Sequence, residues 1–159
     1  MCEYCGCQDI PAIGQLTDEH DAIVAVMSHV RSALDAGQVD AAAHWSRRIT
    51  TLLVPHTAVE EEGLFPALAG EFPDHVATLR GEHRAVETVL DEAAACTPTD
   101  PTWPYRLTEA LYLLREHILK EQNGMFPAAL TSLDPADWDV MAAVRERVGT
   151  ALEPEGTRA

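Results

Sequence analysis

The chain has 159 residues, 47% of them hydrophobic and 23% charged, which is the composition of a folded domain rather than of a disordered segment. Its 26 acidic residues outnumber its 11 lysines and arginines, and a net charge of −15 argues against nucleic acid or a membrane surface as a partner. Because no apolar run approaches the roughly 20 residues of a membrane span and no signal peptide is evident, we expect a cytoplasmic protein.

The N-terminal segment is set apart by its cysteines. Residues 1–14 contain Cys2, Cys5 and Cys7, and we expect them to form an irregular lead-in. Three closely spaced thiols can bind Zn²⁺, Cu⁺ or an iron–sulfur cluster, or cycle as a dithiol. The alternative is that they are reduced thiols without a special role. Cys96 is expected to be a small buried residue.

Amphipathic helices account for the next part of the chain. Apolar residues recur at spacings of three and four over residues 17–36, and Gly37 marks the end of this first helix. A second helix is expected from Asp40. We expect it to bend at Pro55, because proline removes a backbone hydrogen bond, and to end or bend again after Glu62.

The second half of the chain has a similar organisation. A third helix is expected from residue 73 or 74, and a fourth from Pro104 toward Gly124. Asp134 begins a last helix, which extends to residue 152. Since no segment alternates with a period of two, we predict an all-α fold. It is an up-down-up-down four-helix bundle with an additional C-terminal helix over residues 15–152, followed by a flexible tail over residues 153–159.

One sequence pattern occurs twice, once in each half. A histidine is followed four residues later by a glutamate, and then by Gly-x-Phe-Pro-Ala; a Glu-His pair precedes each copy. The first copy consists of Glu19, His20, His56, Glu60, Gly63 and Phe65, and the second of Glu82, His83, His117, Glu121, Gly124 and Phe126.

Helical geometry directs part of this pattern toward the bundle interior. Residues four apart lie about 40° from each other around a helix, so His56 and Glu60 point the same way. The same holds in the second copy, and His20 and His83 lie within apolar stripes. Buried carboxylates without partners are costly, and a pair of metal ions would compensate both. The predicted metal ligands are His20, His56, Glu60, His83, His117 and Glu121.

Two simpler interpretations compete with a metal site. A single histidine on an apolar stripe is usually a hydrogen-bonded core residue, and His-x-x-x-Glu pairs also occur on helix surfaces. The near-symmetric recurrence favours the metal site over both. His29, His44 and His75 do not fit the pattern and are not expected to be ligands. Iron, manganese and zinc all accept these donors, and affinity order does not choose among them.

The six-residue pattern resembles the hemerythrin family, in particular the bacterial cation-binding domains that include the di-iron domain of iron–sulfur cluster repair proteins. The resemblance covers residue 16 to about residue 130. It implies two iron ions, joined by an oxo or hydroxo bridge and by Glu60 and Glu121 as bridging carboxylates, with manganese or zinc as substitutes. The oxygen carriers of this family differ: they have a histidine where this chain has Glu87 and an aspartate where it has Gln122.

This departure shapes the expected function. Two histidines, two bridging carboxylates and the bridge make five ligands per iron, which leaves an open position on each. We therefore expect a site that binds or reacts with O₂, peroxide or NO, served by a redox partner protein. Turnover would mean peroxide or NO handling or the repair of iron centres. The alternatives are a reversible O₂ or redox sensor or carrier, and a structural zinc bundle. Glu87 is either an additional ligand or an acid near the site.

Overall fold

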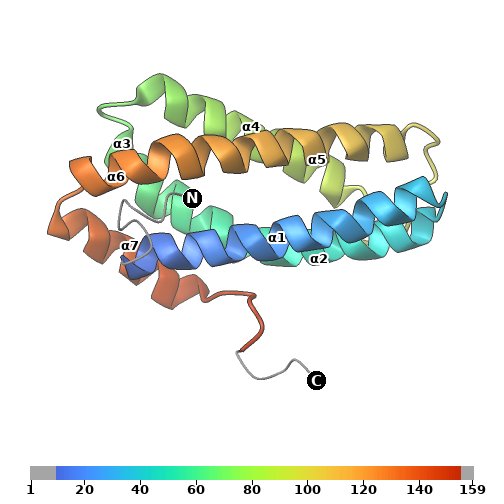
Figure 1. Cartoon of the computed structure of the whole chain (residues 1–159), viewed down its shortest axis with the longest axis horizontal. Coiled ribbons are helices and arrows are strands. Elements are labelled where there is room, and N and C mark those ends of the chain that lie inside the picture. The colour runs from blue at the N-terminus through green and yellow to red at the C-terminus, as the bar shows by residue number, and fades with distance from the viewer. Residues whose placement is uncertain (1–9, 155–159) are drawn as a thin grey trace.

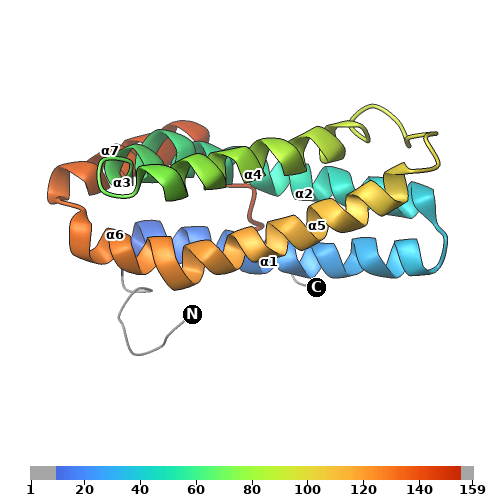
Figure 2. The same ribbon diagram turned by 90° about the horizontal axis from the view of Figure 1, so that it is seen from above.

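The computed structural model describes residues 10–154. All regular secondary structure in this range is helical, which confirms the all-α prediction. Four long helices lie side by side as a helical bundle (Figures 1 and 2). They are α1 (Pro11–Asp35), α2 (Val39–Val59), α4 (Pro73–Asp91) and α5 (Trp103–Lys120). Cys2, Cys5 and Cys7 and the end of the predicted tail, residues 155–159, lie outside the described residues.

The first helix begins earlier than the sequence pattern indicates. Helix α1 starts at Pro11 and not near Thr17, so residues 11–14 are helical instead of irregular. Proline is well suited to the first position of a helix, where its missing N–H is not needed. Ile13 and Leu16 are fully buried and anchor this first turn in the core. Gly37 ends the helix as predicted, with a φ of 70°.

Each half of the bundle contains a π-helical segment that begins at a predicted glutamate ligand. Helix α2 continues through η2 (Glu60–Leu64) into the short α3 (Phe65–Leu68). Helix α5 continues in the same way through η3 (Glu121–Met125) into α6 (Phe126–Ser132). The N–H of Phe65 bonds to the carbonyl of Glu60, and that of Phe126 to the carbonyl of Glu121.

A proline follows shortly after each of these segments. Pro66 and Pro127 have no N–H, so neither can supply the usual helical hydrogen bond to the residue four before it. The wider i→i+5 turn accommodates this loss without ending the helix. The repeated Gly-x-Phe-Pro-Ala sequence therefore does not terminate the helices. It shifts the rotational position, around the helix axis, of the side chains that follow Glu60 and Glu121.

The last helix, α7 (Pro135–Val148), begins where it was predicted. Asp134 and Asp137 form a capping box, each side chain accepting a backbone N–H of the other residue. The helix ends at Val148 instead of reaching residue 152, because Gly149 leaves the helical conformation with a φ of 69°. Helix α7 packs against α2 and η2.

Gly63 lies at this contact. A Cβ atom built on Gly63 would stand 2.9 Å from Met141 Cγ and 3.2 Å from Met141 Cα, closer than side chains approach. We expect Gly63→Ala to lower the free energy of unfolding by about 1–3 kcal/mol, the usual cost of overpacking. Chemical denaturation of the variant measures this loss.

The second half of the chain supplies the control. Gly124 holds the equivalent position in η3, but a Cβ there meets nothing within 4 Å. Gly124→Ala should be neutral or stabilising by about 0.5–1 kcal/mol, because alanine restricts the unfolded chain more than glycine does. Equal losses in the two variants would contradict the assignment of the cost to the α7 contact.

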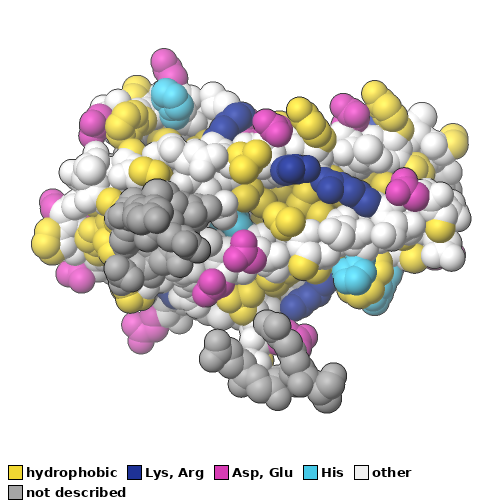
Figure 3. Space-filling model, viewed as in Figure 1, with side chains coloured by type: hydrophobic (Ala, Val, Ile, Leu, Met, Phe, Trp, Pro, Cys, Tyr) yellow, Lys and Arg dark blue, Asp and Glu magenta, His cyan; other side chains and the backbone are white. Residues whose placement is uncertain are grey.

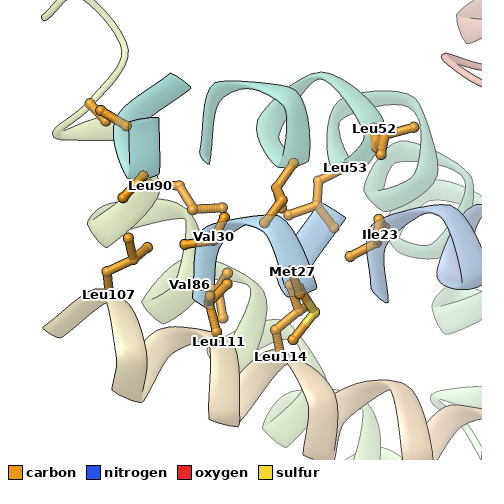
Figure 4. Packing of buried hydrophobic residues seen from close by; sticks show 14 of the residues in the cluster. Ile23, Met27, Val30, Leu52, Leu53, Val86, Leu90, Leu107, Leu111 and Leu114 are labelled. Atoms are coloured by element: carbon orange, nitrogen blue, oxygen red, sulfur yellow. The ribbon is translucent and has the colours of Figure 1, made fainter. Parts of the chain in front are cut away.

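Two hydrophobic clusters fill the bundle. One lies toward the α1–α2 and α4–α5 connections and includes Ile23, Met27 and Leu114 (Figure 4). The other includes Leu16, Phe65 and Phe126 and is closed by α7. Along each long helix the predicted ligands fall between residues of the first cluster and residues of the second. The apolar stripes thus place a polar layer between two apolar ones.

Two further features complete the fold. Cys96, in the connection between α4 and α5, is exposed, so the prediction that it is buried is wrong. Trp103 occupies the interior instead, at the start of α5, and its indole N–H bonds to the carbonyl of Val89. No helix in residues 10–154 is long and apolar enough to cross a membrane.

Candidate metal centre

The structure brings the six predicted ligands together in the layer between the two clusters. All six are buried, none more than 4% exposed. Their donor atoms form two groups of four, each within 4.8 Å. One group contains His20 and His56, the other contains His83 and His117, and both contain Glu60 and Glu121.

Each carboxylate faces histidines of both groups. The Oε1 atom of Glu60 lies 3.0 Å from Nε2 of His56, and its Oε2 atom lies 3.2 Å from Nε2 of His83. Glu121 repeats the arrangement, with Oε1 2.9 Å from Nε2 of His117 and Oε2 3.1 Å from Nε2 of His20. This is the placement expected of two carboxylates that bridge two cations.

The donor atoms themselves indicate a cation. Both carboxylate oxygens of Glu60 and of Glu121 are buried without a hydrogen-bond partner among the described residues, and so are the Nε2 atoms of His20, His83 and His117. Buried polar atoms are rarely left unpaired, since each costs about 1–3 kcal/mol. Imidazole nitrogen and carboxylate oxygen are the donors that iron, manganese and zinc accept. The residues present therefore fit a pair of such ions.

The opposite ring nitrogen of each histidine is held by a second side chain. The Nδ1 atom of His56 lies 2.8 Å from Oε2 of Glu19, and that of His117 lies 2.9 Å from Oε2 of Glu82. A carboxylate in this position accepts the Nδ1 proton and leaves Nε2 free to bind a metal. The Glu-His pair of each repeat thus supplies a ligand from its histidine and a hydrogen-bond acceptor from its glutamate.

Sequence reasoning did not identify Glu19 and Glu82. Each lies next to a ligand and therefore about 100° away from it around the helix. Each reaches the histidine of the following helix instead of one on its own. The signal that would have found them is the repeated Glu-His pair, because symmetry implies that the glutamate has the same task in both halves.

The remaining two histidines have partners that differ in charge. The Nδ1 atom of His83 lies 2.8 Å from Oε1 of Glu61, whereas that of His20 lies 3.2 Å from the side-chain amide of Gln122. Glu61 follows Glu60 as Gln122 follows Glu121, so the two positions are equivalent in the repeat. The Nδ1 atoms of His56, His83 and His117 therefore lie next to a carboxylate, whereas the Nδ1 atom of His20 lies next to a neutral amide.

The phenylalanines of the repeat pack on the remaining ring faces. Phe65 stacks on His83 and Phe126 stacks on His20, each with ring centroids 5.6 Å apart. Both phenylalanines are fully buried. The π-helical segments place them there, since the rings follow directly after η2 and η3. The Gly-x-Phe-Pro-Ala sequence therefore fixes ring orientation as well as backbone phase.

Basic side chains offset the buried outer carboxylates. Arg145 of α7 contacts both oxygens of Glu19, at 2.7 and 3.0 Å, and the Thr150 hydroxyl donates to Glu19 at 2.7 Å. Lys120 contacts Glu82. Burial raises the pKa of Glu19, but its contacts with His56, Arg145 and Thr150 outweigh burial and lower it. Glu19 is thus held as a carboxylate.

Without metal, the site holds protons. Burial favours the neutral imidazole, but the charge of Glu60 and the hydrogen bond to Glu19 raise the pKa of His56 from 6.5 to about 10. Burial also lowers the pKa of His83, but the interactions with Glu60, Glu121 and Glu61 are stronger and raise it to about 9. Burial raises the pKa of Glu60, but His56 and His83 together lower it well below its usual value.

These shifts predict how the stability of the metal-free protein depends on pH. A histidine with a raised folded-state pKa stabilises the fold fully below its unfolded value of 6.5, and this stabilisation is lost as the pH rises through about 9 and 10. After chelator treatment, the urea midpoint should therefore fall between pH 6.5 and 10. Glu60→Gln removes the charge responsible and should flatten the profile. A wild-type midpoint that stays constant over this range would contradict the prediction.

Other candidate residues lie elsewhere. His29, His44 and His75 are exposed and are not among the buried groups, as predicted. Glu87 is partly buried and belongs to neither group of four. Burial, together with the nearby charges of Glu61 and Asp91, raises its pKa, although His83 opposes the shift.

The comparisons with known proteins agree with this geometry. The family model of the hemerythrin HHE cation-binding domain matches residues 12–129. No curated protein and no solved structure gives a significant match. The matched region begins in α1, ends in α6 and contains all six predicted ligands. The chain therefore belongs to the hemerythrin HHE cation-binding domain family.

Proposed function

We propose that the chain is a non-haem di-iron protein that binds or reacts with O₂, peroxide or NO. The observation that carries the proposal is the sharing of Glu60 and Glu121 between the two groups of donor atoms. Two histidines and two shared carboxylates provide four donors per ion, which would complete the tetrahedral preference of zinc but leave positions open on iron. Iron ions held by these residues would supply the electrons with which O₂, peroxide or NO reacts.

The residues of the chain support this role in three ways. Glu19, Glu61 and Glu82 accept hydrogen bonds from the Nδ1–H groups of three imidazoles and so direct the Nε2 atoms toward the cations. The two hydrophobic clusters keep bulk water away from the layer. The proposal includes four long helices that alternate in direction, as in an up-down-up-down bundle, with two ligand-bearing helices from each half of the chain.

The proposed ligand is small, and turnover would need a redox partner protein in the cytoplasm. Peroxide or NO removal and the repair of iron centres are the reactions that such a site would perform. Reversible O₂ or redox sensing and a structural zinc site are the competing functions.

Metal analysis combined with optical spectroscopy separates these functions. We expect two iron ions per chain and a charge-transfer absorption that changes on adding peroxide or NO. A spectrum that responds reversibly to O₂ without consuming it would favour a sensor or carrier. Stoichiometric zinc, with no spectral response after exchange for iron, would refute the proposal.

A further inference from the structure

Two grooves open between the long helices of the bundle, and one of them reaches a predicted ligand. The first has a volume of about 390 Å³, lies between α1 and α5, and is lined by His20 and Gln122. The second has a volume of about 260 Å³, lies between α2 and α4, and is lined by Leu90 and Glu87. Val24 and Met27 of the first groove correspond in the repeat to Glu87 and Leu90 of the second, so the grooves overlap in position, but the second is lined by none of the predicted ligands.

The two grooves carry opposite charge. Arg31 and Arg115 line the first groove, together with Asp21. Glu87 and Asp91 line the second, where no basic residue is present. The position equivalent to Arg115 is Val54 in the second groove. Lys and Arg side chains gather over the seam between α1 and α5 on the face that Figure 3 shows.

The arginines of the first groove are free to bind a ligand. Among the described residues, only three arginine side chains make neither a hydrogen bond nor an ion pair to protein, namely Arg31, Arg84 and Arg115. Two of these three line the same groove. Positive charge left unpaired beside a buried centre, on an otherwise acidic surface, attracts anions.

We propose that the groove between α1 and α5 binds a small planar monoanion, of the carboxylate or nitrite kind, between Arg31 and Arg115, about three turns along α1 from His20. The guanidinium groups of Arg31 and Arg115 provide paired N–H donors that match two oxygens of such an anion. Gln122 forms the inner wall and joins the groove to the Nδ1 atom of His20. The second groove, lined by Glu87 and Asp91, should not bind the same ligand.

The site does not require a metal, because the arginines and the groove belong to the protein. A titration of ¹⁵N-labelled protein with formate and with nitrite, at constant ionic strength, tests it in both the metal-free and the zinc-loaded protein. Failure to bind two metal ions would bear on the proposed function and would leave the metal-free titration interpretable. Formamide, a neutral molecule of the same shape as formate, is the matched ligand control.

We expect both anions to shift the resonances of the Arg31 and Arg115 side chains and of Leu119, which also lines the groove, in a saturable way, and formamide to shift none of them. The double variant Arg31→Gln/Arg115→Gln should bind about tenfold more weakly, the loss expected from two exposed ion pairs. Arg84→Gln should bind as the wild type does. The proposal is overturned if the double variant binds as tightly as wild type, if Arg84→Gln loses as much affinity, or if formamide competes equally.

Discussion

Replacing Glu60 with alanine should remove metal from both positions of the centre. The two oxygens of Glu60 face a histidine of each donor group, at 3.0 and 3.2 Å, so one substitution removes a ligand from each ion. Loss of a hydrogen-bond partner behind a ligand already costs about 10–100-fold in metal affinity. Loss of a shared ligand should cost more than about 100-fold. Metal content after dialysis against a weak chelator measures the effect.

A neighbouring glutamate provides the control for this experiment. Glu62 lies in the same π-helical segment, but it is exposed and pairs with Arg147 on the surface. Glu62→Ala should retain the wild-type metal content. Glu121→Ala should reproduce the loss seen with Glu60→Ala, because Glu121 has the equivalent place in the second half. Full occupancy of both positions in Glu60→Ala would rule out the bridging role.

Replacing Arg145 with alanine should produce a large loss of stability although Arg145 is not a predicted ligand. Arg145 contacts both oxygens of Glu19, whose side chain is only 1% exposed, and Glu19 in turn holds His56. Removing Arg145 leaves this buried carboxylate with only His56 and Thr150 as partners, and losing one partner of a buried ion pair costs up to about 3 kcal/mol. Chemical denaturation of the metal-free protein measures this cost.

Two residues further along α7, Arg147 forms an ion pair that is largely exposed. Arg147→Ala should lower the free energy of unfolding by no more than about 1 kcal/mol, the range for surface ion pairs. Arg145→Lys keeps a positive charge and should recover part of the loss. If the two alanine variants are equally stable, α7 does not stabilise the centre through Glu19.

The sequence predicted most of the architecture because each helix carries its own periodic signal. The apolar stripes and the end signals Gly37 and Asp134 predicted the all-α fold and several boundaries correctly. The start of the first helix was predicted wrongly because proline can either lie in an irregular segment or begin a helix. Pro11 begins a helix although residues 1–14 were expected to be irregular. After Glu62, where an end or a bend was expected, the helix continues through a π-helical segment.

The candidate ligands were also accessible from sequence. Residues four apart on a helix share a face regardless of how that helix packs, so His56 and Glu60 had to point together. The duplication of the pattern added the second pair. The structure places all of these side chains in one buried layer, as the pattern predicted.

What surrounds the ligands was decided by the packing of helices against one another. Glu19 lies on a different face of α1 from His20, and only the position of α2 makes it the partner of His56. The approach of α5 to α1 likewise brings Gln122 to His20 and places Arg31 and Arg115 along one groove. The sequence alone determined the helices and the residues that share a face, because periodicity is a local property. The hydrogen-bond partners, the role of α7 and the charge of each groove depend on helix rotation and spacing, which only the tertiary structure specifies.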